Sequence, residues 1–176
     1  MDPSDDVRLI IRAQAGDLAA FEQILRSLEP ALRRYVGRLV GARAITDDVL
    51  QETFLRIWRG IGWLRDPALF RAWAYRIATR ETHRLMARER QRDELRADEA
   101  EMETLAAPFA DPAARLDLES TLMRISPHAR TVLAAHYFEG LTLEEVAAVT
   151  ETPLGTAKSR LASGLKQARA LLEAPE

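Results

Sequence analysis

Hydrophobic and polar positions follow a helical period along almost the whole chain. Apolar residues recur every three or four positions through 18–29, 46–60 and 67–91, and through several shorter stretches after residue 116. No stretch keeps the strict apolar–polar alternation of a half-buried strand. The pattern therefore predicts an all-α protein.

Capping residues and prolines divide this pattern into separate helices. Asp17 precedes a helix over 18–29, and Pro30 is expected to begin another helix. Asp66, which is followed by a proline, predicts the start of a long helix that ends near Gln91. These signals predict a run of helices in the first half of the chain.

The helical pattern weakens between two regions of the sequence. Residues 92–115 are rich in acids, include Pro108 and Pro112, and contain few large apolar side chains. We interpret this segment as a flexible linker, and a helical first half stays open as an alternative. The expected fold is thus all-α, with two small helical domains at 1–91 and 116–176 joined by an acidic linker.

The second domain contains two helices joined by a tight turn. Thr142 and Glu145 form a capping box before a short helix over 143–149, and Pro153 begins the last helix. Such a pair is typical of a helix-turn-helix DNA-binding motif. The last helix is expected to pack inward through Leu154, Ala157, Leu161, Leu165, Ala168 and Leu172. Its expected DNA-facing residues are Thr156, Lys158, Ser159, Arg160, Ser163 and Lys166. The alternative is an ordinary helical hairpin with a solvated face.

Charge is unevenly distributed, although the whole chain has a formal net charge of only −2. Residues 65–92 hold eight arginines against three acids, whereas residues 93–119 hold nine acids against two arginines. This segregation indicates an anion-binding surface followed by an anion-like segment. Like charges four residues apart destabilise an isolated helix by about 0.2–0.5 kcal/mol per pair. A polyanionic partner would explain the stripe of Arg76, Arg80, Arg84 and Arg88, although a merely soluble basic face is the alternative.

The helix over 46–60 presents acids and a leucine on its outer face. Asp48, Glu52 and Leu55 are expected to point outward, with Gln51 at the edge. Such a face suits docking against a basic helix of a partner. The opposite face is expected to be buried through Leu50, Phe54, Ile57, Trp58 and Ile61.

Two of these segments resemble conserved regions of the extracytoplasmic-function sigma factors, the smallest class of bacterial transcription initiation factors. The stretch "DDVLQETFLRIW" resembles the family's second region, and "LTLEEVAAVTETPLGTAKSRLASGLKQARALL" resembles its fourth region. The resemblance extends over about residues 8–172. It implies a protein that binds core RNA polymerase, directs it to promoters and melts the minus-ten element. The frequent Arg-Ala pair of the family's recognition helix is Ser163–Gly164 here.

The resemblance also implies roles for individual residues. Core polymerase would contact Asp48, Gln51, Glu52 and Leu55. The minus-ten element would be bound by Arg65, Asp66, Arg76, Arg80, Arg84 and Arg88, with a flipped base held by the loop "GWLRDPALF". The last helix would read the minus-thirty-five element, and an anti-sigma factor is a further expected partner.

Two other functions stay open from the sequence. A stand-alone helix-turn-helix regulator would bind duplex DNA without polymerase. An enzyme is disfavoured because His83, His128 and His136 lack metal-ligand spacing and no nucleophile has an evident base. We therefore expect no enzymatic activity, cofactor, metal site or small-molecule substrate.

The expected location is the cytoplasm, without membrane insertion. The chain has no cysteine, its first ten residues are acidic, unlike a signal peptide, and no apolar run approaches the roughly 20 residues that span a bilayer.

Overall fold

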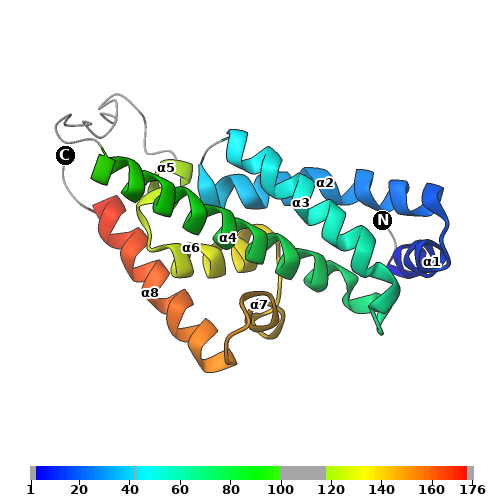
Figure 1. The fold of residues 1–176 in the computed structure, drawn as a ribbon. Coiled ribbons are helices and arrows are strands. Elements are labelled where there is room, and N and C mark those ends of the chain that lie inside the picture. Colours follow the sequence, from blue (N-terminus) through cyan, green and yellow to red (C-terminus); the bar gives the residue numbers. More distant parts are fainter. Residues whose placement is uncertain (1–2, 42, 100–117, 174–176) are drawn as a thin grey trace.

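The computed structural model describes residues 3–41, 43–99 and 118–173, and within them every regular element is helical, which confirms the all-α prediction. Helices α2, α3 and α4 lie side by side, and the elements after residue 118 pack against α4 and one end of α2 (Figure 1). The helices are α1 (Pro3–Gln14), α2 (Leu18–Val40), α3 (Arg43–Gly60), α4 (Phe70–Glu99), α5 (Leu118–Arg124), α6 (Pro127–Leu133), α7 (Leu143–Thr150) and α8 (Leu154–Glu173). Shorter turns are η1 (Ile61–Trp63), η2 (Pro67–Leu69) and the π-helical turn η3 (Ala134–Phe138).

Helix α2 begins as predicted but does not end at Pro30. The Asp17 carboxylate accepts a hydrogen bond from the Ala20 amide at 3.0 Å and caps the helix. The predicted new helix at Pro30 is wrong, because α2 continues through this residue to Val40. Pro30 is exposed, while α2 buries apolar side chains in the core before it, at Phe21 and Ile24, and after it, at Leu32. Tertiary packing therefore outweighs the backbone hydrogen bond that the proline removes.

Helix α4 is preceded by a separate turn and is longer than the sequence predicted. Asp66 caps η2, and its carboxylate accepts from the Ala68 amide at 3.0 Å. The α-helix begins at Phe70 and runs to Glu99, past the expected end near Gln91. The first part of the predicted linker, 92–99, is therefore helical, and 100–115 lies outside the described residues. The domain boundaries themselves stay a prediction.

The chain between α6 and α7 turns through an unusual helical segment. In η3 the Glu139 amide donates to the Ala134 carbonyl, five residues earlier, at 3.2 Å. Gly140 follows with a φ of 66°, a conformation that glycine adopts without steric cost. The predicted capping box of Thr142 and Glu145 is then present in both directions, at 3.2 and 2.8 Å.

The inward face of α8 differs from the prediction near its C-terminal end. Ala157 is buried as expected, but Leu165 and Leu172 are exposed, by 41% and 52%. Gly164 takes the inward position, and a Cβ there would lie 2.8 Å from Leu133 Cδ1. The missing side chain lets α8 approach α6 closely, which gives a structural reason for glycine at this position.

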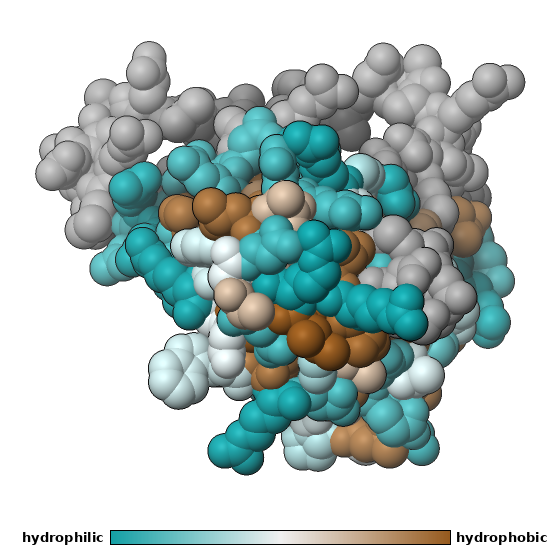
Figure 2. Space-filling model, turned by 90° about the vertical axis from the view of Figure 1, so that its right-hand side faces the viewer, coloured by the Kyte–Doolittle hydropathy of each residue, from teal (hydrophilic) through white to brown (hydrophobic). Residues whose placement is uncertain are grey.

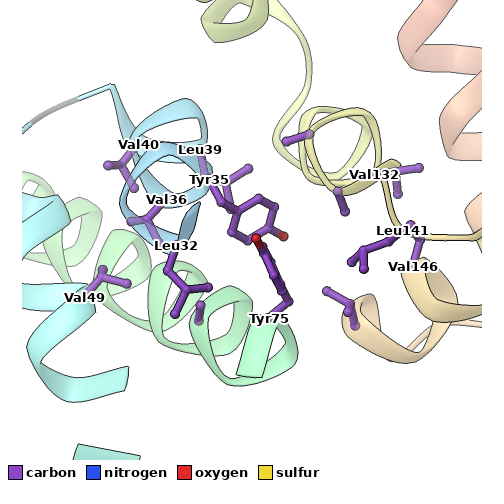
Figure 3. Close-up of a cluster of buried hydrophobic side chains, with 14 of the residues drawn as sticks. Leu32, Tyr35, Val36, Leu39, Val40, Val49, Tyr75, Val132, Leu141 and Val146 are labelled. Carbon is purple, nitrogen blue, oxygen red and sulfur yellow. The ribbon is translucent and has the colours of Figure 1, made fainter. Parts of the chain in front are cut away.

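The two ends of the chain share one hydrophobic core. We call residues up to Glu99 the N-terminal half and residues from Leu118 the C-terminal half. Tyr35 and Tyr75 meet edge to face, with ring centroids 5.0 Å apart, and both are fully buried. Figure 3 shows these rings between α2 and α4 on one side and Val132, Leu141 and Val146 on the other. The halves thus pack directly against each other.

A shared core predicts that the two halves unfold together. All three tryptophans, at positions 58, 63 and 73, lie in the N-terminal half, whereas Leu141 belongs to the C-terminal half and is 1% exposed. Leu141→Ala should destabilise the fold by about 2–5 kcal/mol. It should therefore lower the urea midpoint that tryptophan fluorescence reports. Leu165→Ala, at an exposed position, is the control, and an unchanged tryptophan transition in Leu141→Ala would show that the halves unfold independently.

Candidate polymerase and promoter interfaces

The outer face of α3 is available for a partner. Asp48 and Gln51 are exposed, and Leu55 is 42% exposed although it is a large apolar residue. Glu52 is half-buried, and its carboxylate lies 3.0 Å from Arg56 Nε and 3.6 Å from an Arg84 nitrogen. The four residues predicted to contact polymerase thus share α3, but Glu52 is also engaged within the chain.

The buried face of α3 agrees with the prediction except at Trp58. Leu50, Ile57 and Ile61 are buried, and Phe54 is partly buried. Trp58 is 40% exposed, so the prediction that it is buried was wrong. Its ring rests on Phe21 of α2, with centroids 4.7 Å apart, which leaves the outer edge of the indole in solvent.

A buried acid joins α3 to α4 and was missed in the sequence. The Glu81 side chain is only 5% exposed and lies 2.7 Å from Arg56 and 2.6 Å from Arg84. The sequence analysis counted it only as one of the three acids in 65–92. A signal was present in the sequence, because Ala74, Ala78 and Glu81 follow helical spacing and therefore lie on one face of α4. The structure shows that both alanines on this face are fully buried.

The predicted arginine stripe of α4 is partly neutralised within the chain. Arg84 is held by Glu81 and Glu52, and Arg80 forms a 2.7 Å ion pair with Glu151 from the end of α7. Among the described side chains, Arg65, Arg76 and Arg88 have no acidic partner within 4 Å. The six residues predicted to contact the minus-ten element thus lie in one stretch of the chain. Some of their side chains are already paired with acids of the protein, and others are available for phosphates.

The loop before α4 is fixed by hydrogen bonds but exposes an aromatic ring. The Gln14 side-chain amide donates to the carbonyls of Ile61 and Leu64, at 3.0 and 2.8 Å. Trp63 between them is 87% exposed; it lies in the loop predicted to hold a flipped base but was not singled out as a site residue. Asp66 caps η2 and so has a structural role beside its predicted one.

The end of the molecule that carries α1 and this loop has a mixed surface. Figure 2 shows hydrophobic side chains gathered at its centre among hydrophilic ones. A pocket of about 470 Å³ is lined there by α1, α2, η2 and the start of α4, mostly with apolar residues such as Ile10, Leu28 and Phe70. Arg71 and Asp6 add charges of opposite sign to its wall. The pocket is within the size range of ligand-binding sites.

The outer face of α8 is open along most of its length. Lys158, Ser159, Ser163 and Lys166 are exposed, whereas Thr156 and Arg160 are half-buried. Within this helix-turn-helix, α7 ends at Thr150, and the C-cap residue Glu151 that follows has a φ of 52°. The short side chains around the lysines leave the α8 backbone accessible to a groove-shaped partner.

His83 of α4 contacts α6 in a positively charged environment. Its Nε2 lies 3.2 Å from Thr131 Oγ1, and its ring meets that of His128 edge to face at 5.9 Å. Burial lowers the pKa of His83 below 6.5, and the positive charges of His128, Arg160 and Arg90 lower it further. His83 is therefore neutral in the folded protein near pH 7.

The described residues contain no group of three or more histidines and acids arranged to hold a metal ion. Over the same residues, no helix is long and apolar enough to cross a membrane.

Comparisons with known proteins agree on one family. The Sigma-70 region 2 model matches residues 24–92, and the Sigma-70 region 4 model matches residues 115–167. The RNA polymerase sigma-H factor of Pseudomonas aeruginosa is 31% identical over 176 residues, which cover 89% of this chain and 88% of that protein. The chain belongs to the RNA polymerase sigma factors. The ECF sigma factor SigE of Mycolicibacterium smegmatis is 28% identical over 96% of this chain and 69% of its own length, which supports the extracytoplasmic-function group.

Solved sigma-factor structures have the same fold. CnrH in complex with the cytosolic domain of CnrY is 25% identical, with a TM-score of 0.73, over 99% of this chain and 100% of that one. RpoE in complex with the anti-sigma factor NepR from Bartonella quintana is also 25% identical, with a TM-score of 0.70, over 89% and 98%. The predicted family and two-domain helical fold are confirmed, and the protein is a transcription initiation factor that directs RNA polymerase. The roles of individual residues stay predictions.

The lowered pKa of His83 predicts a loss of stability in acid. The unfolded chain binds a proton at His83 near pH 6.5, while the folded chain binds it only at lower pH. Neutral His83 therefore contributes stability above about pH 6.5 that is lost as the pH falls through the lowered folded pKa. Urea unfolding at about pH 7.5 and 5.5 should show a smaller acid loss for His83→Gln than for wild type. Equal losses in both proteins would contradict this source of pH dependence.

Proposed function

We propose that this sigma factor contacts core RNA polymerase through α3, the minus-ten element through α4 and the loop before it, and the minus-thirty-five element through α8. It would act in the cytoplasm by binding alone, with no chemical step of its own. The observation that carries the proposal is the separation of charge between exposed helix faces. Exposed Asp48 on α3 is suited to a basic partner, while half-buried Arg76 and exposed Arg88 on α4, and exposed Lys158 on α8, are suited to phosphates.

Opening of the minus-ten element would use the loop before α4. An exposed indole such as Trp63 can stack on an unpaired base, and such stacking contributes about 1–3 kcal/mol per base. The neighbouring pocket at Phe70 and Arg71 supplies an apolar wall and a positive charge for a base removed from the duplex. Arg76 and Arg88 would contact the adjoining phosphates.

An anti-sigma factor is the proposed regulatory partner. The similar structures of CnrH and RpoE are complexes, with the cytosolic domain of CnrY and with the anti-sigma factor NepR. Similarity over nearly the full chain supports a partner of the same kind here.

The polymerase interface can be tested on α3 without disturbing the Glu81 network. We expect the double variant Asp48→Arg with Leu55→Asp to weaken binding to core polymerase by roughly tenfold or more. The first change reverses a charge at the contact, and the second places a carboxylate where an apolar side chain would be buried against polymerase. Binding should be measured by titrating labelled sigma factor with core polymerase. Glu52 is left unchanged because it pairs with Arg56 and Arg84.

A matched control exists on α2. Glu22→Arg with Leu18→Asp makes the same types of change at exposed positions, where Leu18 is 65% exposed and Glu22 is 63% exposed. This control should bind core polymerase as wild type does. Equal affinity of both double variants would remove α3 from the interface.

The upstream contact should depend on salt through the lysines of α8. Lys158→Ala with Lys166→Ala is expected to weaken binding of the holoenzyme to a duplex carrying the minus-thirty-five element. The plot of log affinity against log salt should also become shallower by about one to two. The reason is that binding releases fewer counterions from the DNA for each phosphate contact that is lost. Arg34→Ala with Arg124→Ala, also exposed, is the control. A salt slope equal to wild type would exclude these lysines as phosphate contacts.

A further inference from the structure

The loop before α4 is anchored by a side chain from a distant part of the chain. Gln14 is the last residue of α1, and its Nε2 donates to the carbonyls of Ile61 and Leu64, which lie 47 and 50 positions later. Nε2 carries two N–H groups, and these two carbonyls use both of them. The acceptors lie on either side of Gly62 and Trp63. One side chain therefore fixes both ends of the segment that carries the exposed indole.

The position of Gln14 is itself fixed by the packing of α1. Ile10 is 3% exposed and belongs to the same hydrophobic cluster as Ile61. Gln14 follows Ile10 by four residues, so both lie on the inner face of α1. Near the end of this helix, Arg12 Nε and Nη2 donate to one carboxylate oxygen of Asp17, at 2.9 and 2.6 Å, and so join α1 to the start of α2. The amide that holds the loop is thus presented by a well-packed helix.

The loop has little support of its own. The turn η1 contains three residues, and its own hydrogen bond joins the Leu64 amide to the Ile61 carbonyl at 3.2 Å. Such short turns have poor hydrogen-bond geometry. A Cβ at Gly62 would meet no atom within 4 Å, and Trp63 is 87% exposed, so the outer side of the turn is not packed. Its order therefore depends on the buried side chain of Ile61 and on Gln14.

Helix α1 also lines the pocket beside this loop. Val7 and Ile10 of α1 share the pocket wall with Pro67 and Ala68 of η2. The helix thus contributes to both features that the proposed function assigns to an unpaired base, the pocket and the exposed ring. The Sigma-70 region 2 match begins at residue 24, after the end of α1.

We propose that Gln14 is a positioning residue for promoter opening, and that its two hydrogen bonds hold Trp63 ready to stack on an unpaired base of the minus-ten element. A loop without this anchor would lose conformational freedom when it bound DNA, and that loss would weaken the contact. With the anchor in place, much of this freedom is already lost when the protein folds. The inference rests on the proposed function of the loop before α4.

Gln14→Met removes the anchor with little change in side-chain size. Methionine is an unbranched residue that favours helices, but it has no N–H donor. Gln23→Met, at an exposed position of α2, is the matched control. Both variants should bind core polymerase as wild type does.

Hydrogen exchange of the free chain reports the order of the loop without DNA or polymerase. Gln14→Met should speed exchange of the amides in 61–66 by about fivefold or more, as expected for the loss of at least one net hydrogen bond. Gln23→Met should leave this exchange unchanged. Equal exchange in Gln14→Met and wild type would overturn the proposal. Faster exchange throughout α2 and α4 would overturn it too, because Gln14 would then stabilise the whole fold.

The effect on promoter opening is measured with holoenzyme and two DNA probes. Both probes derive from a promoter selected from a random duplex library by transcription with the wild-type holoenzyme. The first is a fork whose non-template minus-ten strand is unpaired, and the second is a duplex that ends upstream of this element. Gln14→Met should weaken binding to the fork by about fivefold, and Trp63→Ala should weaken it by about fivefold or more, as for the loss of one stacked base. Neither change should alter binding to the upstream duplex.

A double variant decides whether Gln14 acts through Trp63. If it does, Gln14→Met with Trp63→Ala should bind the fork no more weakly than Trp63→Ala alone. Additive losses would overturn the proposal, because Gln14 would then act at another place. Full affinity of Gln14→Met beside a loss in Trp63→Ala would also overturn it, but would leave the proposed function of the loop intact. Full affinity of Trp63→Ala would instead overturn that function, and this inference with it.

Discussion

The carboxylate of Glu139 needs partners that its own half of the chain does not provide. It enters a nearly dry interface beside the Tyr35–Tyr75 pair and is neutralised by Arg38 and Tyr75. Burial also raises the pKa of Tyr75 well above its ordinary value, and the hydrogen bond to Glu139 adds to the effect, so the phenol stays protonated and continues to donate. The relative position of the helices depends on this arrangement, because a shift of either half would leave a buried charge unpaired.

The positive charges on the basic face of α4 are also neutralised in part by acids of the chain. Glu81 is buried among Arg56 and Arg84, and Glu151 reaches Arg80 from the other half. Acids from α3, α4 and the end of α7 thus occupy positions that phosphates would take in the proposed complex with DNA. Exchange of one set of anions for another is expected to have a small net energy at exposed positions such as Arg80, where water screens the charges. The basic face of α4, which we propose as a DNA contact, can therefore keep its fold without DNA.

Local signals in the sequence predicted much of the helical framework. Asp17, Asp66 and the Thr142–Glu145 box act through neighbouring backbone atoms, so their effects can be read from short stretches. Pro30 misled the prediction because distant core contacts hold α2 continuous. Glu81 and Arg130 were missed for a related reason: their partners are brought to them by tertiary packing. For the candidate site, the sequence predicted which residues share α3, α4 and α8, but not that Arg80, Arg84 and Glu52 have partners within the chain.

The π-helical turn η3 sets the direction in which Glu139 points. The amide of Glu139 reaches back five residues instead of four, so this turn holds one residue more than an α-helical turn would. One residue corresponds to about 100° of rotation around a helix axis. A chain shortened by one residue within Ala134–Phe138 would keep the helices on both sides and still aim this carboxylate away from Arg38. The wide turn thus acts as an angular spacer, and the fit between the halves depends on the length of this segment as much as on its chemistry.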